Sequence, residues 1–299
     1  MKFEKNINKN IEDEINNICI TNKKTKLVLC GGGMKGLYLI GGLKYLSELD
    51  ILKNITTYAG TSIGGLICFM LSIDYSIDEL YKCLKTFNFE NTIDENFDLN
   101  SIFKDYSINS HQNIDFIVEK IMNYKNINKN ITLIQLYNKT KKKIILTSVN
   151  IYDKICEYIS YETYPDLEIL TALKMTMAVP LLFPPIKLNN KLYIDGGILN
   201  NFPIDIFNDN LDEVIGINLQ SEFLYVKNYD NIINYILRIM SIFFQPNIKK
   251  FTDENYKNIV YNIKIDNDVK TFNFELTSEK KKEMYLNGYN LFKNEYDKN

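Results

Sequence analysis

Short apolar runs alternate with stretches of helical periodicity in the first part of the chain. The run at 26–30 (K-L-V-L-C) ends abruptly in glycines, which is typical of a buried strand that leads into a tight loop. Apolar residues then recur at helical spacing over 34–49, and a second strand over 55–59 is followed by a helix over 63–73. Two successive strand–helix units predict a parallel α/β sheet with helices covering its faces.

The rest of the chain continues this pattern after an interruption. The stretch 76–140 is more polar and more helical, and we interpret it as an insertion over the sheet edge. Further strands are predicted at 143–149, 155–160, 191–194 and 213–219, with a helix at 166–178. A broadly apolar helix is predicted at 231–245, a pattern more typical of a buried helix than of a lid or a membrane-contacting helix.

These patterns divide the chain into three parts. A polar N-terminal extension (1–25) with a short leading helix precedes a core (26–220) that contains the helical insertion, and a mainly helical C-terminal extension (221–299) packs on the core. No internal repeat or low-complexity linker separates two domains. A chain of 299 residues with 45% hydrophobic residues is long enough to bury a large core.

Composition excludes several classes of protein. The formal net charge of −2 gives no global attraction to nucleic acid, and lysine runs such as 141–143 and 280–282 are interpreted as solvated faces. Five cysteines at scattered spacings and one histidine predict neither a disulfide framework nor a metal site. Abundant Asn, Ile, Lys and Tyr suggest an AT-rich genome. Without a hydrophobic signal region or a bilayer-spanning run, we expect an intracellular protein, cytoplasmic or peripheral to a membrane.

Candidate chemistry begins at Ser62, which lies between Gly60 and Gly64 in the sequence A-G-T-S-I-G-G. This G-x-S-x-G pattern is typical of a sharp strand-to-helix turn, because small residues on either side let the strand and helix approach while the serine hydroxyl is pushed outward. Alone, the pattern is short enough to be an ordinary glycine-rich turn, so the other motifs of the chain must decide whether Ser62 is catalytic.

A glycine-rich loop, G-G-G-M-K-G at 31–36, follows the first strand and opens a helix. Backbone N–H groups at a helix N-terminus can bind negative charge, either as a dinucleotide site or as an oxyanion hole. The dinucleotide interpretation expects an acidic residue at the end of the second strand, and that strand ends in the serine turn instead. In a parallel sheet, Gly32 and Gly33 would lie close to Ser62, as an oxyanion hole requires.

A serine nucleophile needs a base, and the sequence points to Asp195. The only histidine, His111, lies in the polar insertion, so a triad in the order Ser, acid, His is excluded. Asp195 follows a short strand and precedes Gly196 and Gly197, which allow a sharp turn that aims the carboxylate inward. An unperturbed aspartate is a weak base at neutral pH, so the site must raise its pKa or share the proton only in the transition state.

Four motifs in order resemble the patatin-like phospholipases, which are acyl hydrolases with a Ser-Asp dyad. They are G-G-G-M-K-G, G-T-S-I-G-G, M-A-V-P-L-L-F-P-P and Y-I-D-G-G-I-L-N-N-F-P, and they span about 26–219. The resemblance implies a three-layer α/β/α sandwich with a mostly parallel sheet and no catalytic metal or cofactor. It also implies that Ser62 is the nucleophile, that Asp195 is the base, and that Gly31, Gly32, Gly33, Lys35 and Gly36 form the oxyanion loop.

The leading hypothesis is therefore a serine esterase that cleaves fatty-acyl esters of phospholipids or lysophospholipids. Two alternatives stay open: a catalytically silent lipid-binding protein on the same fold, and a dinucleotide-dependent oxidoreductase. The expected partner is a lipid substrate, peripheral contact with a membrane stays open, no nucleic acid is expected, and no protein partner can be named. Asn200 or Asn201, just before Pro203, is expected to cap the following helix.

Overall fold

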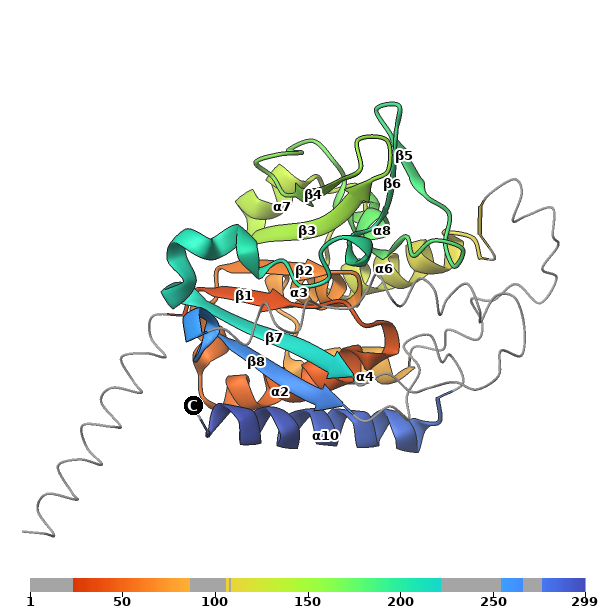
Figure 1. Ribbon diagram of the computed structural model, residues 1–299. Helices are drawn as coiled ribbons and strands as arrows, with labels where there is room; N and C mark the ends of the chain where they lie inside the picture. The colour runs from red at the N-terminus through yellow and green to blue at the C-terminus, as the bar shows by residue number, and fades with distance from the viewer. Residues whose placement is uncertain (1–23, 87–105, 108, 222–253, 266–275, 299) are drawn as a thin grey trace, which may run out of the picture.

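The computed structural model describes residues 24–86, 106–107, 109–221, 254–265 and 276–298 (Figure 1). The helices expected at the N-terminus and at 231–245 lie outside these residues. The strands are β1 (Lys26–Leu29), β2 (Thr57–Thr61), β3 (Lys143–Asn150), β4 (Ile155–Ile159), β5 (Ile186–Leu188), β6 (Lys191–Asp195), β7 (Val214–Ser221) and β8 (Val260–Ile265). The α-helices are α2 (Gly36–Glu48), α3 (Ile63–Ser72), α4 (Ile77–Thr86), α6 (Gln112–Tyr124), α7 (Leu133–Thr140), α8 (Ile169–Met177) and α10 (Ser278–Tyr296).

Short 3-10 helices occupy several of the connections. They are η1 (Gly33–Lys35), η2 (Ile51–Asn54), η4 (Gly196–Ile198), η5 (Ile204–Glu213) and η7 (Glu254–Tyr256). Of these, η4 directly follows β6, so the chain turns at once where that strand ends, and η1 begins four residues after the last residue of β1. Among the described helices, none is long and apolar enough to cross a bilayer.

One mixed sheet organises the molecule. Along its main path the strand order is β5-β6-β3-β2-β1-β7-β8, and β4 pairs with β3. The five strands β3, β2, β1, β7 and β8 run parallel, whereas β4 and β6 are antiparallel to β3, and β5 is antiparallel to β6. The expected sheet, mostly parallel at its centre, is confirmed, and the antiparallel strands gather around β3.

Both faces of the sheet are covered, as β7 illustrates. Successive side chains of a strand point to opposite faces. A Cβ at Gly216 would meet Phe202 and Ile204, which belong to the segment before β7, whereas Ile217 lies against Gly42 of α2. Figure 1 shows α10 along the side of the molecule where α2 and β8 lie, in agreement with its contacts to both. The predicted three-layer α/β/α arrangement is therefore confirmed.

Three strands differ from the expectation. The second strand is displaced by two residues from 55–59 to Thr57–Thr61, so that it leads directly into Ser62. Two strands were not expected: β5 after the proline-rich loop, and β8, which pairs with β7 from beyond residue 220. The three-residue strand β5 carries little periodicity, so only its pairing reveals it, whereas β8 (V-Y-N-I-K-I) alternates apolar and polar residues and so carries a local signal that could have found it. The division of the chain at residue 220 stays a prediction, although the sheet continues past that boundary.

The lysine run at 280–282 is not entirely a solvated face. Lys281 is buried, and its ammonium donates to the carbonyl of Lys85 at the end of α4 at 3.2 Å. A lysine near a helix C-terminus interacts favourably with the unpaired carbonyls there, which offsets part of the cost of its burial. The interpretation as a purely solvated run is therefore wrong for this residue.

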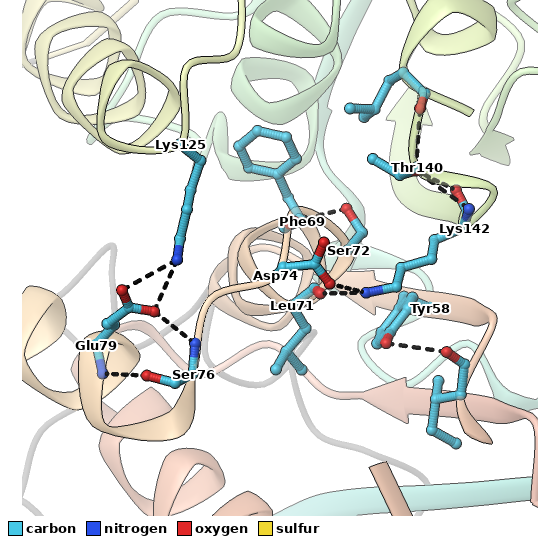
Figure 2. A network of polar contacts seen from close by, with 12 residues as sticks. Tyr58, Phe69, Leu71, Ser72, Asp74, Ser76, Glu79, Lys125, Thr140 and Lys142 are labelled. Atoms are coloured by element: carbon cyan, nitrogen blue, oxygen red, sulfur yellow. Dashed lines mark hydrogen bonds and ion pairs between the residues drawn. The ribbon is translucent and has the colours of Figure 1, made fainter. Parts of the chain in front are cut away.

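Polar contacts fix the C-terminal end of α3 and the start of α4 (Figure 2). Lys142 donates to the Leu71 carbonyl at 3.3 Å and pairs with Asp74 at 2.5 Å. Nearby, Lys125 binds both carboxylate oxygens of Glu79, which also accepts from the Ser76 N–H and has its pKa lowered to about 2. Because α3 begins at the residue after Ser62, these contacts hold the far end of the helix that follows the serine turn.

Candidate active site

Ser62 occupies a strained turn between β2 and α3. Its φ of 54° and ψ of −125° lie in a region that residues with a side chain rarely adopt. The flanking glycines make the close approach that was predicted: a Cβ at Gly60 would lie 2.6 Å from the Gly64 carbonyl carbon, and one at Gly64 would lie 2.4 Å from the Cys30 carbonyl oxygen. Larger residues at either position would therefore push α3 away from β1 and β2.

The backbone N–H of Ser62 is bonded to a side chain from a distant helix. It donates to the Thr176 hydroxyl of α8 at 2.9 Å. Ser62 precedes the first turn of α3, and N–H groups at that position have no partner within the helix. This interaction was not anticipated from the sequence, because residues 62 and 176 are 114 positions apart.

Strand register brings Asp195 to Ser62. β3 has two edges at which another strand can pair. The stretch of β3 that pairs with β4 overlaps the stretches that pair with β2 and with β6, so β4 must lie on one edge. β2 and β6 therefore lie one after the other on the other edge. Thr61 pairs with Thr147, and Asp195 pairs with the next residue, Ser148. Because β2 and β6 run in opposite directions, they end facing one another, and the two predicted residues stand where the two strands meet.

The Asp195 carboxyl group is completely buried, and this burial raises its pKa from 3.8 to about 7. Smaller opposing effects come from the Gly197 N–H, which donates to Oδ1 at 2.7 Å, and from the Ser62 hydroxyl. Oδ2 has no partner at hydrogen-bonding geometry among the described residues, so the contact from Ser62 is looser than a fully formed hydrogen bond. Such contacts commonly tighten when a substrate binds.

The two glycines after Asp195 have separate structural roles. A Cβ at Gly196 would lie 2.4 Å from the Thr147 carbonyl oxygen, so no side chain fits there. Gly197 supplies the N–H that fixes the orientation of the carboxylate. The predicted sharp turn is present as η4, and it holds Asp195 at the end of β6.

The glycine loop begins beside Ser62. A Cβ at Gly31 would lie 3.3 Å from the Ser62 Cβ, and one at Gly36 would lie 2.6 Å from the Ile63 side chain. Gly33 has a positive φ of 55°, which glycine adopts without strain. Gly32 and Gly33 stand at the start of η1, where backbone N–H groups have no partner within the helix. The loop therefore starts beside the serine, and Gly32 and Gly33 stay candidates for the predicted oxyanion hole.

Cys30 precedes this loop and Lys35 lies within it, and both are buried. Burial lowers the pKa of the Lys35 ammonium, and a weaker interaction with Cys30 opposes that shift. Burial raises the pKa of the Cys30 thiol to about 12, and its sulfur accepts from the Leu219 N–H at 3.2 Å. Cys30 is thus a neutral thiol at physiological pH and is not a competing nucleophile.

The asparagines after Asp195 do not cap the following helix as expected, since the residue that precedes η5 is Pro203, which makes no side-chain cap. Asn201 instead binds Gly31 twice: its carbonyl accepts from the Gly31 N–H at 3.0 Å, and its Nδ2 donates to the Gly31 carbonyl at 3.2 Å. The Asn200 carbonyl accepts from the Thr61 hydroxyl at 3.0 Å. The expected cap is absent because both side chains bind elsewhere: Asn201 binds the glycine loop, and Asn200 Nδ2 donates to the Tyr158 hydroxyl at 2.9 Å and to Asp205 Oδ1 at 2.8 Å.

His111 takes no part in this arrangement. It precedes α6, and the pKa of its imidazole is lowered by burial and by the nearby Lys174 ammonium. The groups that act on the pKa of Asp195 are Gly197 and Ser62, and His111 is not among them. Within the described residues, no group of three or more His, Cys, Asp or Glu side chains is placed to hold a metal ion.

Two viral proteins are similar in sequence to this chain. The probable lipid hydrolase 463L of Invertebrate iridescent virus 6 is 41% identical over 183 residues, which cover 60% of this chain and 62% of that protein. The mimivirus protein R571 is 29% identical over 269 residues, covering 87% of this chain and 89% of that one.

Among solved structures, VipD from Legionella pneumophila matches with a TM-score of 0.63 at 18% identity. The match covers 92% of this chain and 67% of VipD, and at this identity it shows the shared fold. The type III effector ExoU matches with a TM-score of 0.53 at 13% identity, covering 92% of this chain and 53% of that one. The family model for patatin-like phospholipases matches residues 27–208, more than half of the chain, and includes all the motifs described above. The chain therefore belongs to the patatin-like phospholipase family.

Proposed function

We propose that this protein hydrolyses fatty-acyl esters of phospholipids or lysophospholipids through a dyad of Ser62 and Asp195. The observation that carries the proposal is the meeting of a strained serine turn with a fully buried carboxyl group whose pKa is raised to about 7. A pKa near the working pH suits a general base, and a serine needs such a base to act as a nucleophile. The family match and the relative named a probable lipid hydrolase support a lipid substrate.

In the proposed reaction, Ser62 Oγ attacks the ester carbonyl while Asp195 Oδ2, the oxygen left without a partner, takes the hydroxyl proton. The N–H groups of Gly32 and Gly33 stabilise the oxyanion that develops on the carbonyl oxygen. The C–O bond to the alcohol then breaks, and Asp195 returns the proton to the leaving oxygen. Asp195 next takes a proton from water as the water oxygen attacks the acyl carbonyl. The bond to Ser62 Oγ then breaks, Asp195 returns the proton to Oγ, and the fatty acid is released.

The first experiment compares ester hydrolysis and fluorophosphonate labelling of the wild type with Ser62→Ala and Asp195→Asn. Both variants are expected to lose at least about 1,000-fold in kcat, because the first lacks the nucleophile and the second lacks the base. Ser72→Ala is the matched control, since Ser72 is also buried on α3 and donates to the Phe69 carbonyl at its C-terminal end. Lipid profiling of wild type against Ser62→Ala then identifies the ester that is cleaved.

Two results would contradict the proposal. A folded wild type that neither labels with fluorophosphonate nor hydrolyses esters would favour the lipid-binding alternative. Activity that is lost in His111→Ala would indicate a histidine base. The dinucleotide alternative has less support, because β2 runs directly into Ser62 instead of ending at an acidic residue.

A further inference from the structure

Thr176 contacts the nucleophile's backbone without reaching the reacting atoms. It lies near the C-terminal end of α8 and is completely buried. Its hydroxyl oxygen accepts the Ser62 N–H at 2.9 Å, and its methyl group packs where α3 begins, 3.3 Å from the position that a Cβ of Gly65 would occupy. One side chain thus makes a polar contact with the serine turn and an apolar contact with the helix that follows it.

The polar contact matters because the backbone of Ser62 is strained. A residue with a φ of 54° and a ψ of −125° keeps this conformation only where its surroundings enforce it. On either side, Gly60 and Gly64 permit the turn by offering no steric resistance, but they do not select it. Among the described contacts of Ser62, the bond to Thr176 is a specific attraction that acts on the strained residue itself.

We propose that Thr176 is a positioning residue, which holds Ser62 in the orientation needed for attack. The inference rests on the proposed function and adds a residue to it. By accepting the Ser62 N–H, the Thr176 hydroxyl also occupies that donor, so the oxyanion must be stabilised from the glycine loop and the start of α3. Without the Thr176 hydroxyl, Ser62 would no longer be held in this orientation and its N–H would lose its partner. We therefore expect kcat to fall while the affinity for substrate changes less.

Three substitutions separate the two contacts of Thr176. Thr176→Val keeps the shape and removes the hydroxyl, whereas Thr176→Ser keeps the hydroxyl and removes the methyl group. We expect kcat for a soluble ester, and the rate of fluorophosphonate labelling, to fall about 10-fold to 100-fold in the Val variant, with KM within about twofold. The Ser variant should retain activity within about threefold, even if its thermal unfolding temperature is lower. Thr176→Ala differs from Thr176→Ser only in the hydroxyl, so this pair decides the question if the Val variant does not fold.

Thr140→Val is the matched control, because the Thr140 hydroxyl also accepts a backbone N–H, that of Lys142 at 3.2 Å, and it lies at the end of α7, near the end of β2 that is opposite to Ser62. Its activity should match that of the wild type. Full activity in Thr176→Val, or equal loss in the Val and Ser variants, would overturn the positioning role and leave the proposed function intact. A wild type no more active than Ser62→Ala would overturn the proposed function itself and, with it, this inference.

Discussion

At the scale of single residues, the decisive feature is the burial of Asp195. A carboxylate removed from water loses its hydration, so its neutral form is favoured and its pKa rises. Here two hydrogen-bond donors oppose the effect without cancelling it, and the pKa reaches about 7. The aspartate thereby gains the basicity that its sequence alone does not give it, so the proposed mechanism needs no histidine.

This pKa predicts the pH dependence of activity. The base works only when ionised, so kcat/KM should be constant above about pH 7 and fall about tenfold per pH unit below it. The measurement is a pH–rate profile of the wild type and of His111→Ala, which should share the same midpoint. A midpoint near pH 4, or one that moves in the histidine variant, would show that Asp195 is not the titrating base.

At the scale of elements, the segment from Asp195 to Asn201 connects the parts of the site. It carries the carboxylate at one end and binds Gly31 at the other, while the Asn200 carbonyl accepts from Thr61 of β2. Two strands and the glycine loop are thus held by one short stretch of chain. The relative position of the serine and the glycine loop depends on these bonds and on the packing around them.

Asn201→Ala tests this connection. The bond from Nδ2 to the Gly31 carbonyl would be lost while the backbone bond remains, so we expect kcat to fall about 10-fold with little change in KM. Steady-state kinetics beside Asn208→Ala, an exposed asparagine, provide the comparison. Unchanged kcat in Asn201→Ala would show that the backbone bond alone holds the loop.

At the scale of the whole molecule, α10 seals the side of the sheet where α2 lies. The two helices cross at glycines, since a Cβ at Gly288 would lie 2.3 Å from the Tyr38 carbonyl oxygen and one at Gly41 would lie 2.2 Å from the Tyr285 carbonyl oxygen. Next to this crossing, Phe292 is fully buried between α2 and β8 and stacks obliquely on Tyr261. The C-terminal helix therefore completes the core.

Gly288→Ala should destabilise the protein, although the same change in an exposed helix stabilises by about 1 kcal/mol. The added methyl group would overlap backbone atoms of α2, and overpacking of this kind costs about 1–3 kcal/mol. Denaturant unfolding of Gly288→Ala and of Asn290→Ala, an exposed residue on the same helix, measures the difference. If Gly288→Ala were as stable as the wild type, or more stable, then α2 and α10 could move apart at little cost in free energy.

Local patterns in the sequence were enough to place most elements and to select Ser62, Asp195 and the glycine loop as candidates. Helical periodicity and apolar runs report which face of an element is buried, and glycines mark the turns where the backbone approaches closely. These signals lie within a few residues of one another. β8 also has a local alternation of apolar and polar residues and could have been predicted, whereas the burial of Lys281 and the true partners of Asn200 and Asn201 depend on residues far away in the sequence.

The position of the serine turn was therefore readable from the sequence itself, because its two glycines and the flanking strand and helix are all local. Its chemistry was decided only by the tertiary structure. The pairing of β2 and β6 on one edge of β3 brings Asp195 to Ser62, and burial there sets the carboxyl pKa. The bond from Ser62 to Thr176 likewise joins residues 114 positions apart. Strand register and desolvation are properties of the assembled molecule, and no short stretch of sequence contains them.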